Sequence, residues 1–202
     1  MTVSSCPCCK RTPERKSAGI LVAALWLFAL FLAFPAAAYE PEVRYAELVP
    51  TDDLYVINSD FAFELGPRLE EVVVHGIPLH FVAECVVTRG RWYWRDERIV
   101  EKRLAFRISF QALTRKYRLS VGSLGRSFDT LNEAVGAMKR LRNWGIVDRD
   151  RLKGGETYNV ALRFRLDTNM LPKPFQVTAI GSREWSLETP WSSWSVLASN
   201  GR

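Results

Sequence analysis

The chain has 202 residues, of which 48% are hydrophobic and 25% are charged. This composition is typical of a globular protein and argues against a disordered or low-complexity chain. The formal net charge is +6, but four basic residues and one acidic residue before residue 18 account for +3 of it. The rest is spread along predicted strands, which favours an ordinary solvated face over a nucleic-acid-binding surface.

The first 38 residues have the order of a secretory signal. A basic segment precedes an uncharged stretch over residues 18–34, and Pro35 and three alanines follow. We expect cleavage after Ala38. The alternative is an uncleaved signal anchor, because residues 18–38 have close to the roughly 20 apolar residues that span a bilayer. Both interpretations place residues 39–202 in the periplasm, and the second tethers them to the inner membrane.

A hairpin and a helix are predicted next. Residues 43–49 and 54–65 have strand-like patterns and are separated by a Pro-Thr-Asp-Asp turn, which predicts a hairpin. Residues 66–76 place proline in the first turn, acidic residues near the start and glycine at the end. This order predicts a short amphipathic helix.

Strand patterns return over residues 77–88 and 92–113. Apolar and polar residues alternate most clearly over residues 104–110, so we expect one buried and one wet face. A turn over residues 111–115 leads into a second alternating pattern over residues 117–121. The two patterns predict a pair of antiparallel strands.

The clearest helix signal begins at Thr130. Thr130 and Glu133 have the spacing of a capping box, in which each side chain satisfies a free backbone N–H of the other residue. Apolar residues from Leu131 to Leu141 follow at helical spacing. Gly145 is expected to end this helix.

Two final strands are predicted, over residues 158–166 and 175–187. Together the elements predict a mainly β fold, an antiparallel β-sandwich with two short α-helices, preceded by the N-terminal export helix. An immunoglobulin-like or fibronectin-III-like arrangement is one option. We expect a single β-rich domain over residues 39–202, with its core from about residue 43 to 197.

Catalytic and metal-binding chemistry have little support in the sequence. The three cysteines before residue 10 lack the paired spacing of a zinc site, and Cys85 lies in an apolar strand pattern. His75 and His80 have no catalytic motif around them. We therefore expect no catalytic, cofactor-binding or metal-binding residues, no cofactor and no enzymatic activity.

The segment from Arg91 to Arg95 is the most suggestive surface feature. Trp92, Tyr93 and Trp94 follow one another in a strand or turn, so at least one ring is expected on the outer face. Aromatic rings flanked by arginines suit a partner protein, a glycan or membrane headgroups. The alternative is that one ring fills the core and another caps the hairpin.

Near the C-terminus, Trp191 and Trp194 lie in a Trp-Ser-Ser-Trp-Ser string. Arg163 and Arg165 are predicted to point outward from their strand, where they can stack on these rings at ~0.5 to 2 kcal/mol for each cation–π contact. We therefore predict a structural tryptophan–arginine ladder that clamps the last strand.

Three segments and three tryptophans have a pattern in common with a known family. They are residues 74–79 (VHGIPL), 113–117 (LTRKY) and 166–172 (LDTNMLP), with Trp185, Trp191 and Trp194. As a set, from about residue 45 to 196, they resemble the bacterial family catalogued as domain of unknown function 4390 (DUF4390). The resemblance implies an exported protein of Gram-negative envelopes whose gene often lies beside that of a sensor histidine kinase. It implies no catalytic residues.

The sequence thus predicts a non-enzymatic periplasmic interaction domain. Its expected partner is an envelope protein, with a sensor kinase as one candidate, and no nucleic acid. Residues 18–38 are the predicted site of any membrane association. The alternative is an enzyme or a glycan-binding protein that acts on envelope polymers.

Overall fold

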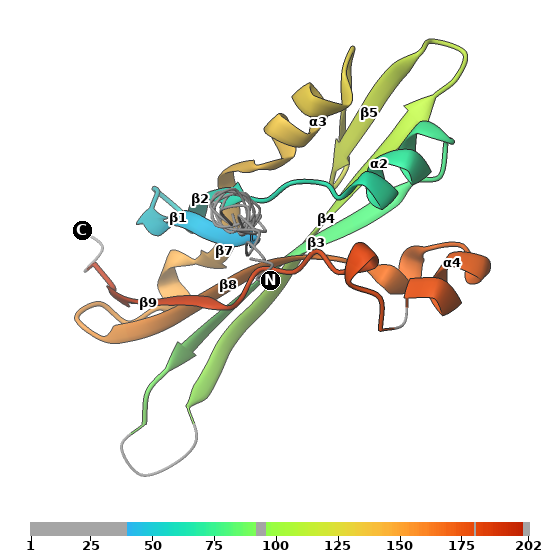
Figure 1. Cartoon of the computed structure of the whole chain (residues 1–202). Helices are drawn as coiled ribbons and strands as arrows, with labels where there is room; N and C mark the ends of the chain where they lie inside the picture. Colours follow the sequence, from blue (N-terminus) through green and yellow to red (C-terminus); the bar gives the residue numbers. More distant parts are fainter. Residues whose placement is uncertain (1–39, 92–95, 180, 200–202) are drawn as a thin grey trace, which may run out of the picture. The chain divides into compact units, whose positions relative to one another are not determined.

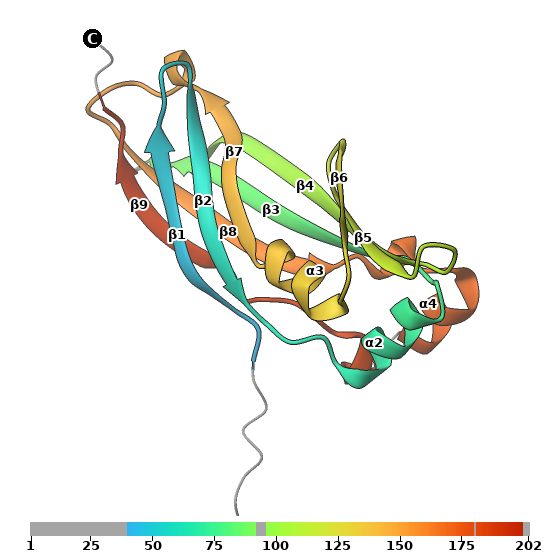
Figure 2. The ribbon, with the colours of Figure 1, turned by 90° about the horizontal axis from the view of Figure 1, so that it is seen from above.

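The computed structural model describes residues 40–91, 96–179 and 181–199. Its strands form two antiparallel sheets, with the orders β1-β2-β7 and β6-β5-β4-β3-β8-β9 (Figure 1). The three-stranded sheet lies over one face of the six-stranded sheet (Figure 2). The fold is therefore the mainly β, antiparallel sandwich that the strand patterns predict. Residues 39–202 form a compact unit of their own.

The strands of this unit alternate with short helices along the chain. The strands are β1 (Glu42–Pro50), β2 (Leu54–Ala62), β3 (Leu79–Arg89), β4 (Glu97–Gln111), β5 (Lys116–Val121), β6 (Leu124–Phe128), β7 (Arg140–Asp148), β8 (Thr157–Leu166) and β9 (Ser192–Leu197). The α-helices are α2 (Pro67–Val74), α3 (Leu131–Met138) and α4 (Lys173–Ala179), and the 3-10 helices are η1 (Arg149–Arg151), η2 (Thr168–Met170) and η3 (Arg183–Trp185). No helix among the described residues is long and apolar enough to cross a membrane.

Phe164 of β8 lies in the core between the two sheets. Its ring stacks on Phe61 at 4.9 Å and on Phe63 at 5.1 Å, both on the β2 side, and on Phe81 of β3 at 5.6 Å. The ring of Phe106 meets it edge-on at 5.5 Å. These aromatic contacts join the two layers of the sandwich, because β2 belongs to one sheet and the strands of Phe81 and Phe106 to the other.

Local sequence explains where the first helices and the first hairpin begin. Pro67 occupies the first turn of α2, where its missing N–H costs nothing. The Thr130 side chain accepts a hydrogen bond from the backbone N–H of Glu133 at 3.2 Å and caps α3. Thr51 closes the β1–β2 turn by donating from its Oγ1 to the carbonyl oxygen of Leu54. The predicted hairpin and both predicted helix starts are confirmed.

The predicted end of the second helix is wrong. The helix ends at Met138, and the chain continues as β7, which pairs with β2. Leu141 is thus a strand residue, and Gly145 lies within β7 rather than ending a helix. The alternation of β7 is interrupted at Asn143, which has a φ of 54°. Such a bulge hides the period of two by which a strand is recognised in a sequence.

The predicted strand over residues 175–187 is also wrong. This segment contains α4 and η3, and the last strand is β9. Pro174 lies in the first turn of α4, a position that proline tolerates. The sequence interpretation also missed β6, a short edge strand that follows the Gly122–Ser123 turn.

Candidate functional site: the arginine-rich face of the six-stranded sheet

The face of the six-stranded sheet that points away from the three-stranded sheet is polar and rich in arginine. On β8, every second residue is buried, so Arg163 and Arg165 lie on the outer face. The register places Glu84 of β3 between Arg163 of β8 and Arg103 of β4. We call this surface the arginine face. Its basic members are Arg103, Arg107, Arg118, Arg163 and Arg165.

Glu84 lies at the centre of an ion-pair cluster on this face. Only 4% of this residue is exposed. Its Oε2 lies 2.6 Å from Nε and Nη2 of Arg163, and its Oε1 lies 3.1 Å from Nη2 of Arg165 and 3.3 Å from Nε of Arg103. We call these four residues the Glu84 cluster. A buried carboxylate needs such partners, because an unpaired charge away from water is very costly.

The electrostatics of the cluster favour the ionised carboxylate. Burial pushes the pKa of Glu84 up, but hydrogen bonds from Arg165 and Arg163 outweigh this, so its pKa lies below the ordinary value. The hydrogen bond to Glu84 in turn raises the pKa of Arg165. Glu188 adds a second acid at the rim, with Oε1 2.7 Å from Nη1 of Arg163. Each of the three arginines thus has an ion pair within this arrangement.

Trp191 covers one end of this cluster. The guanidinium carbon of Arg163 lies 4.4 Å from the centroid of the Trp191 ring, which is a cation–π geometry. Trp194 lies elsewhere. It pairs with Val160, whose side chain is buried, and packs against the core. Trp191 and Trp194 are three residues apart, so in extended chain they point to opposite faces, and the predicted ladder has only Trp191 on the arginine face.

Arg107 and Arg118 occupy the part of the arginine face nearer to β6. Arg107 of β4 lies opposite His80 of β3, and Arg118 lies on β5. In contrast to the arginines of the Glu84 cluster, neither has an ion pair or a hydrogen bond with any residue that the structure describes. Partial burial lowers the pKa of His80, and Arg107 lowers it further, while Asp167 opposes the shift. An imidazole carries no negative charge in either protonation state, so His80 does not balance Arg107.

Gly125 of the edge strand β6 makes room for the guanidinium of Arg118. A Cβ built on Gly125 would lie 2.9 Å from Nη2 of Arg118, too close for an ordinary contact. The guanidinium of Arg118 therefore lies over β6, on the arginine face, in space that any other residue at position 125 would fill. This places a positive charge that has no ion pair with a described residue beside the open edge of the sheet.

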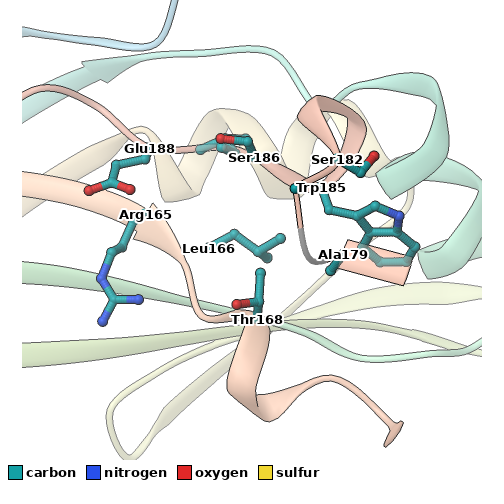
Figure 3. Close-up of a pocket in the computed structure, with 10 residues that line it drawn as sticks. Arg165, Leu166, Thr168, Ala179, Ser182, Trp185, Ser186 and Glu188 are labelled. Carbon is teal, nitrogen blue, oxygen red and sulfur yellow. The ribbon is translucent and has the colours of Figure 1, made fainter. Parts of the chain in front are cut away.

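A pocket of about 390 Å³ lies at the end of the Glu84 cluster. Figure 3 shows Arg165 and Glu188 at one end of this pocket and Trp185 with Ala179 at the other. Hydroxyl groups of Thr168, Ser182 and Ser186 also line it. The lining has a guanidinium, a carboxylate and hydroxyls but no cysteine or histidine, so the pocket suits a small polar molecule better than nucleophilic chemistry.

The predicted aromatic segment lies mostly outside the described residues, since Trp92, Tyr93, Trp94 and Arg95 are not described. The structure does describe the ion pairs at the ends of β3 and β4 that flank this segment. Arg89 donates hydrogen bonds to Glu156 at 2.8 Å and to Glu97 at 2.5 Å, and these bonds raise the pKa of Arg89. Arg91 forms a further ion pair with Glu97 at 2.6 Å.

The cysteine and histidine considered in the sequence lie in environments that do not favour catalysis or metal binding. Cys85 is fully buried, and burial raises the pKa of its thiol to about 12, so the thiolate is not populated at neutral pH. His75 ends α2, where its Nδ1 lies 2.7 Å from the carbonyl oxygen of Glu71. Within the described part of the chain, no group of three or more metal-ligating side chains comes together.

The sequence interpretation missed Glu84, Arg103, Arg107 and Arg118 as site residues. One signal was present, because Glu84 is the only charged residue in the apolar stretch of residues 81–87. An acid in a strand that is buried on both sides must find cations on neighbouring strands. The identity of those cations depends on strand pairing, which the sequence does not give.

Comparison with known proteins identifies the family. Residues 38–195 match the family model described as "Domain of unknown function (DUF4390)". This match covers most of the chain, which therefore belongs to that family. No match was found among curated protein sequences or among solved structures.

Proposed function

We propose that this DUF4390 protein is an exported, non-enzymatic interaction domain that binds an acidic segment of an envelope protein on its arginine face. The proposal depends on one observation. On the arginine face, Arg107 and Arg118 have no ion pair with any residue that the structure describes, whereas each arginine of the adjacent Glu84 cluster has one.

The contrast on this face supports an acidic partner. Surface arginines are usually balanced by acids nearby, as Arg103 and Arg163 are balanced by Glu84 and its neighbours. Arg107 and Arg118 are instead exposed, and the five guanidinium N–H donors of each side chain have no hydrogen-bond partner among the described residues. A patch of one sign attracts a partner of the opposite sign and increases its rate of association.

Two features of the sequence support a periplasmic location and an envelope protein as the partner. The N-terminal 38 residues have the order of an export signal, which supports a periplasmic domain that is either cleaved from the signal or tethered to the inner membrane. In that compartment the partner is an envelope protein. A sensor kinase is the first candidate to test, because of the gene neighbourhood that the family resemblance implies.

Crosslinking in intact cells tests the proposal. A photo-reactive amino acid at the exposed position Ala105 lies on the arginine face, two residues from Arg107 along β4. We expect it to form an adduct with one envelope protein. Arg107→Glu with Arg118→Glu should reduce the adduct at least tenfold, because like charges then face the acidic partner.

The matched control is Arg140→Glu, which reverses an exposed arginine on β7 in the other sheet. This variant should leave the adduct unchanged. An adduct that survives the double reversal, or that Arg140→Glu removes equally, would overturn the proposal. Thermal unfolding of each variant checks that the fold is retained.

A further inference from the structure

β6 forms one edge of the six-stranded sheet, and this edge is exposed to solvent. Its neighbour β5 covers one side only, since β6 is the first strand of the sheet order. The first four residues of β6 are all exposed, and Leu124 is 77% exposed. An edge strand presents unpaired N–H and C=O groups, which are a template for another strand.

The register shows which backbone groups of β6 point outward. Val121 and Leu124 flank the two-residue Gly122–Ser123 turn, so they form the closing pair of the hairpin. Pairs in an antiparallel ladder alternate between hydrogen-bonded and non-hydrogen-bonded. The N–H and C=O groups of Gly125 and Ser127 therefore point away from β5, to the open edge.

Positive charge lies on both faces of this edge. The guanidinium of Arg118 lies over Gly125 on the arginine face. Arg126 pairs with Leu119, whose side chain is buried, so Arg126 lies on the opposite face, and it has no ion pair with any described residue. Cations on an edge strand oppose pairing with a second copy of the same cationic edge. They favour a strand that carries acids.

We propose that the acidic partner segment binds as an additional β-strand on the open edge of β6. Its backbone pairs with Gly125 and Ser127, and its acidic side chains reach Arg118 on one face and Arg126 on the other. Such strand addition takes its affinity from main-chain hydrogen bonds and its specificity from alternating side chains. This inference rests on the proposed function and gives the acidic partner a conformation and a position.

The other edge of the same sheet is a weaker candidate. β9 has the sequence SSWSVL and carries no charged residue. It offers no charge complementarity to an acidic segment. The choice of β6 over β9 therefore follows from Arg118 and Arg126.

Proline at an outward position of β6 tests this mode of binding. Ser127→Pro removes an N–H that points to the open edge, and proline cannot donate to a ladder. Ser127→Ala is the matched control. In the full chain with the photo-reactive residue at Ala105, we expect Ser127→Pro to reduce the adduct at least tenfold and Ser127→Ala to leave it unchanged.

The result also separates this inference from the proposed function. An adduct that is lost in Arg107→Glu with Arg118→Glu but kept in Ser127→Pro would overturn strand addition alone. An adduct that survives all of these changes would overturn both. The melting temperature of Ser127→Pro identifies a variant that fails to fold.

Hydrogen exchange provides a measurement that needs no substitution. In the captured complex, the amides of Gly125 and Ser127 should exchange at least tenfold more slowly than in the free protein. Unchanged exchange at both amides would overturn strand addition. Arg126→Glu should weaken capture, since Arg126 faces the added strand but lies away from the arginine face.

Discussion

The two halves of the arginine face use the same residue type in opposite ways. Around Glu84, three arginines converge on one buried carboxylate, and Glu188 and Trp191 complete the arrangement. Nearer to β6, Arg107 and Arg118 have no ion pair with any described residue. In the first half, every arginine has an ion pair, and these pairs connect β3 with β4 and β8. The second half has charges that no described residue balances, and the proposed acidic partner would balance them.

The difference depends on pairing across the sheet and not on the arginines themselves. Arg103 and Arg107 lie four residues apart on β4 and point to the same face. Arg103 lies opposite Glu84, and Arg107 lies opposite His80. Arg103 therefore has an acid on the neighbouring strand, in addition to Glu101 of its own strand at 3.2 Å, whereas Arg107 has an imidazole opposite it.

Removing the central acid should have the largest effect on stability. Glu84→Gln leaves three arginines converging without their central negative charge, and breaking a buried ion pair from one side costs about 3 kcal/mol. The measurement is the free energy of unfolding from urea titration. The matched change in the other half, Arg107→Gln, should alter it by less than about 0.5 kcal/mol. Equal effects would mean that Glu84 contributes no more to the free energy of unfolding than Arg107 does.

The pH dependence of stability should depend on the same carboxylate. The pKa of Glu84 is lowered in the folded protein by hydrogen bonds from Arg165 and Arg163 that outweigh its burial. Its stabilising contribution is therefore fully present above the ordinary carboxyl pKa and is lost as the pH falls through the lowered value.

Urea unfolding at pH 7 and at about pH 3 measures this contribution. We expect the wild-type protein to lose more stability on acidification than Glu84→Gln loses. Parallel losses in the two proteins would show that other carboxylates, such as Glu97 and Glu156 at the base of the β3–β4 hairpin, dominate the acid response. The pKa values of both are lowered, first by hydrogen bonds from Arg89.

Local signals in the sequence predicted part of this architecture. The capping pair of Thr130 and Glu133 and the turn before β2 act over a few residues, so the sequence alone predicts them. The alternation along β8 likewise predicted that Arg163 and Arg165 point outward. The prediction was wrong where the same residues fit both a strand pattern and a helix. Phe175, Val177 and Ala179 alternate as in a strand, yet they form α4.

The candidate site itself was beyond the reach of local patterns. Glu84 and Arg163 are separated by 79 residues and meet only because β3 pairs with β8 in one register. Strand pairing equally explains why Arg107 has no ion pair with a described residue, since His80 rather than an acid lies opposite. A sequence shows which residues are charged, but strand order decides which charges remain unpaired.

The smallest expected effect concerns Trp191, and it tests whether this ring stabilises the Glu84 cluster. Trp191 is 44% exposed, and the guanidinium of Arg163 lies 4.4 Å from the centroid of its ring. Trp191→Ala should therefore lower the free energy of unfolding by about 1 kcal/mol, the range of a partly exposed cation–π contact. Leu197→Ala, which shortens a 67%-exposed residue of β9, is the control and should change it by less than about 0.5 kcal/mol. If the two variants unfold alike, Trp191 does not clamp Arg163, and the Glu84 cluster is held by its ion pairs alone.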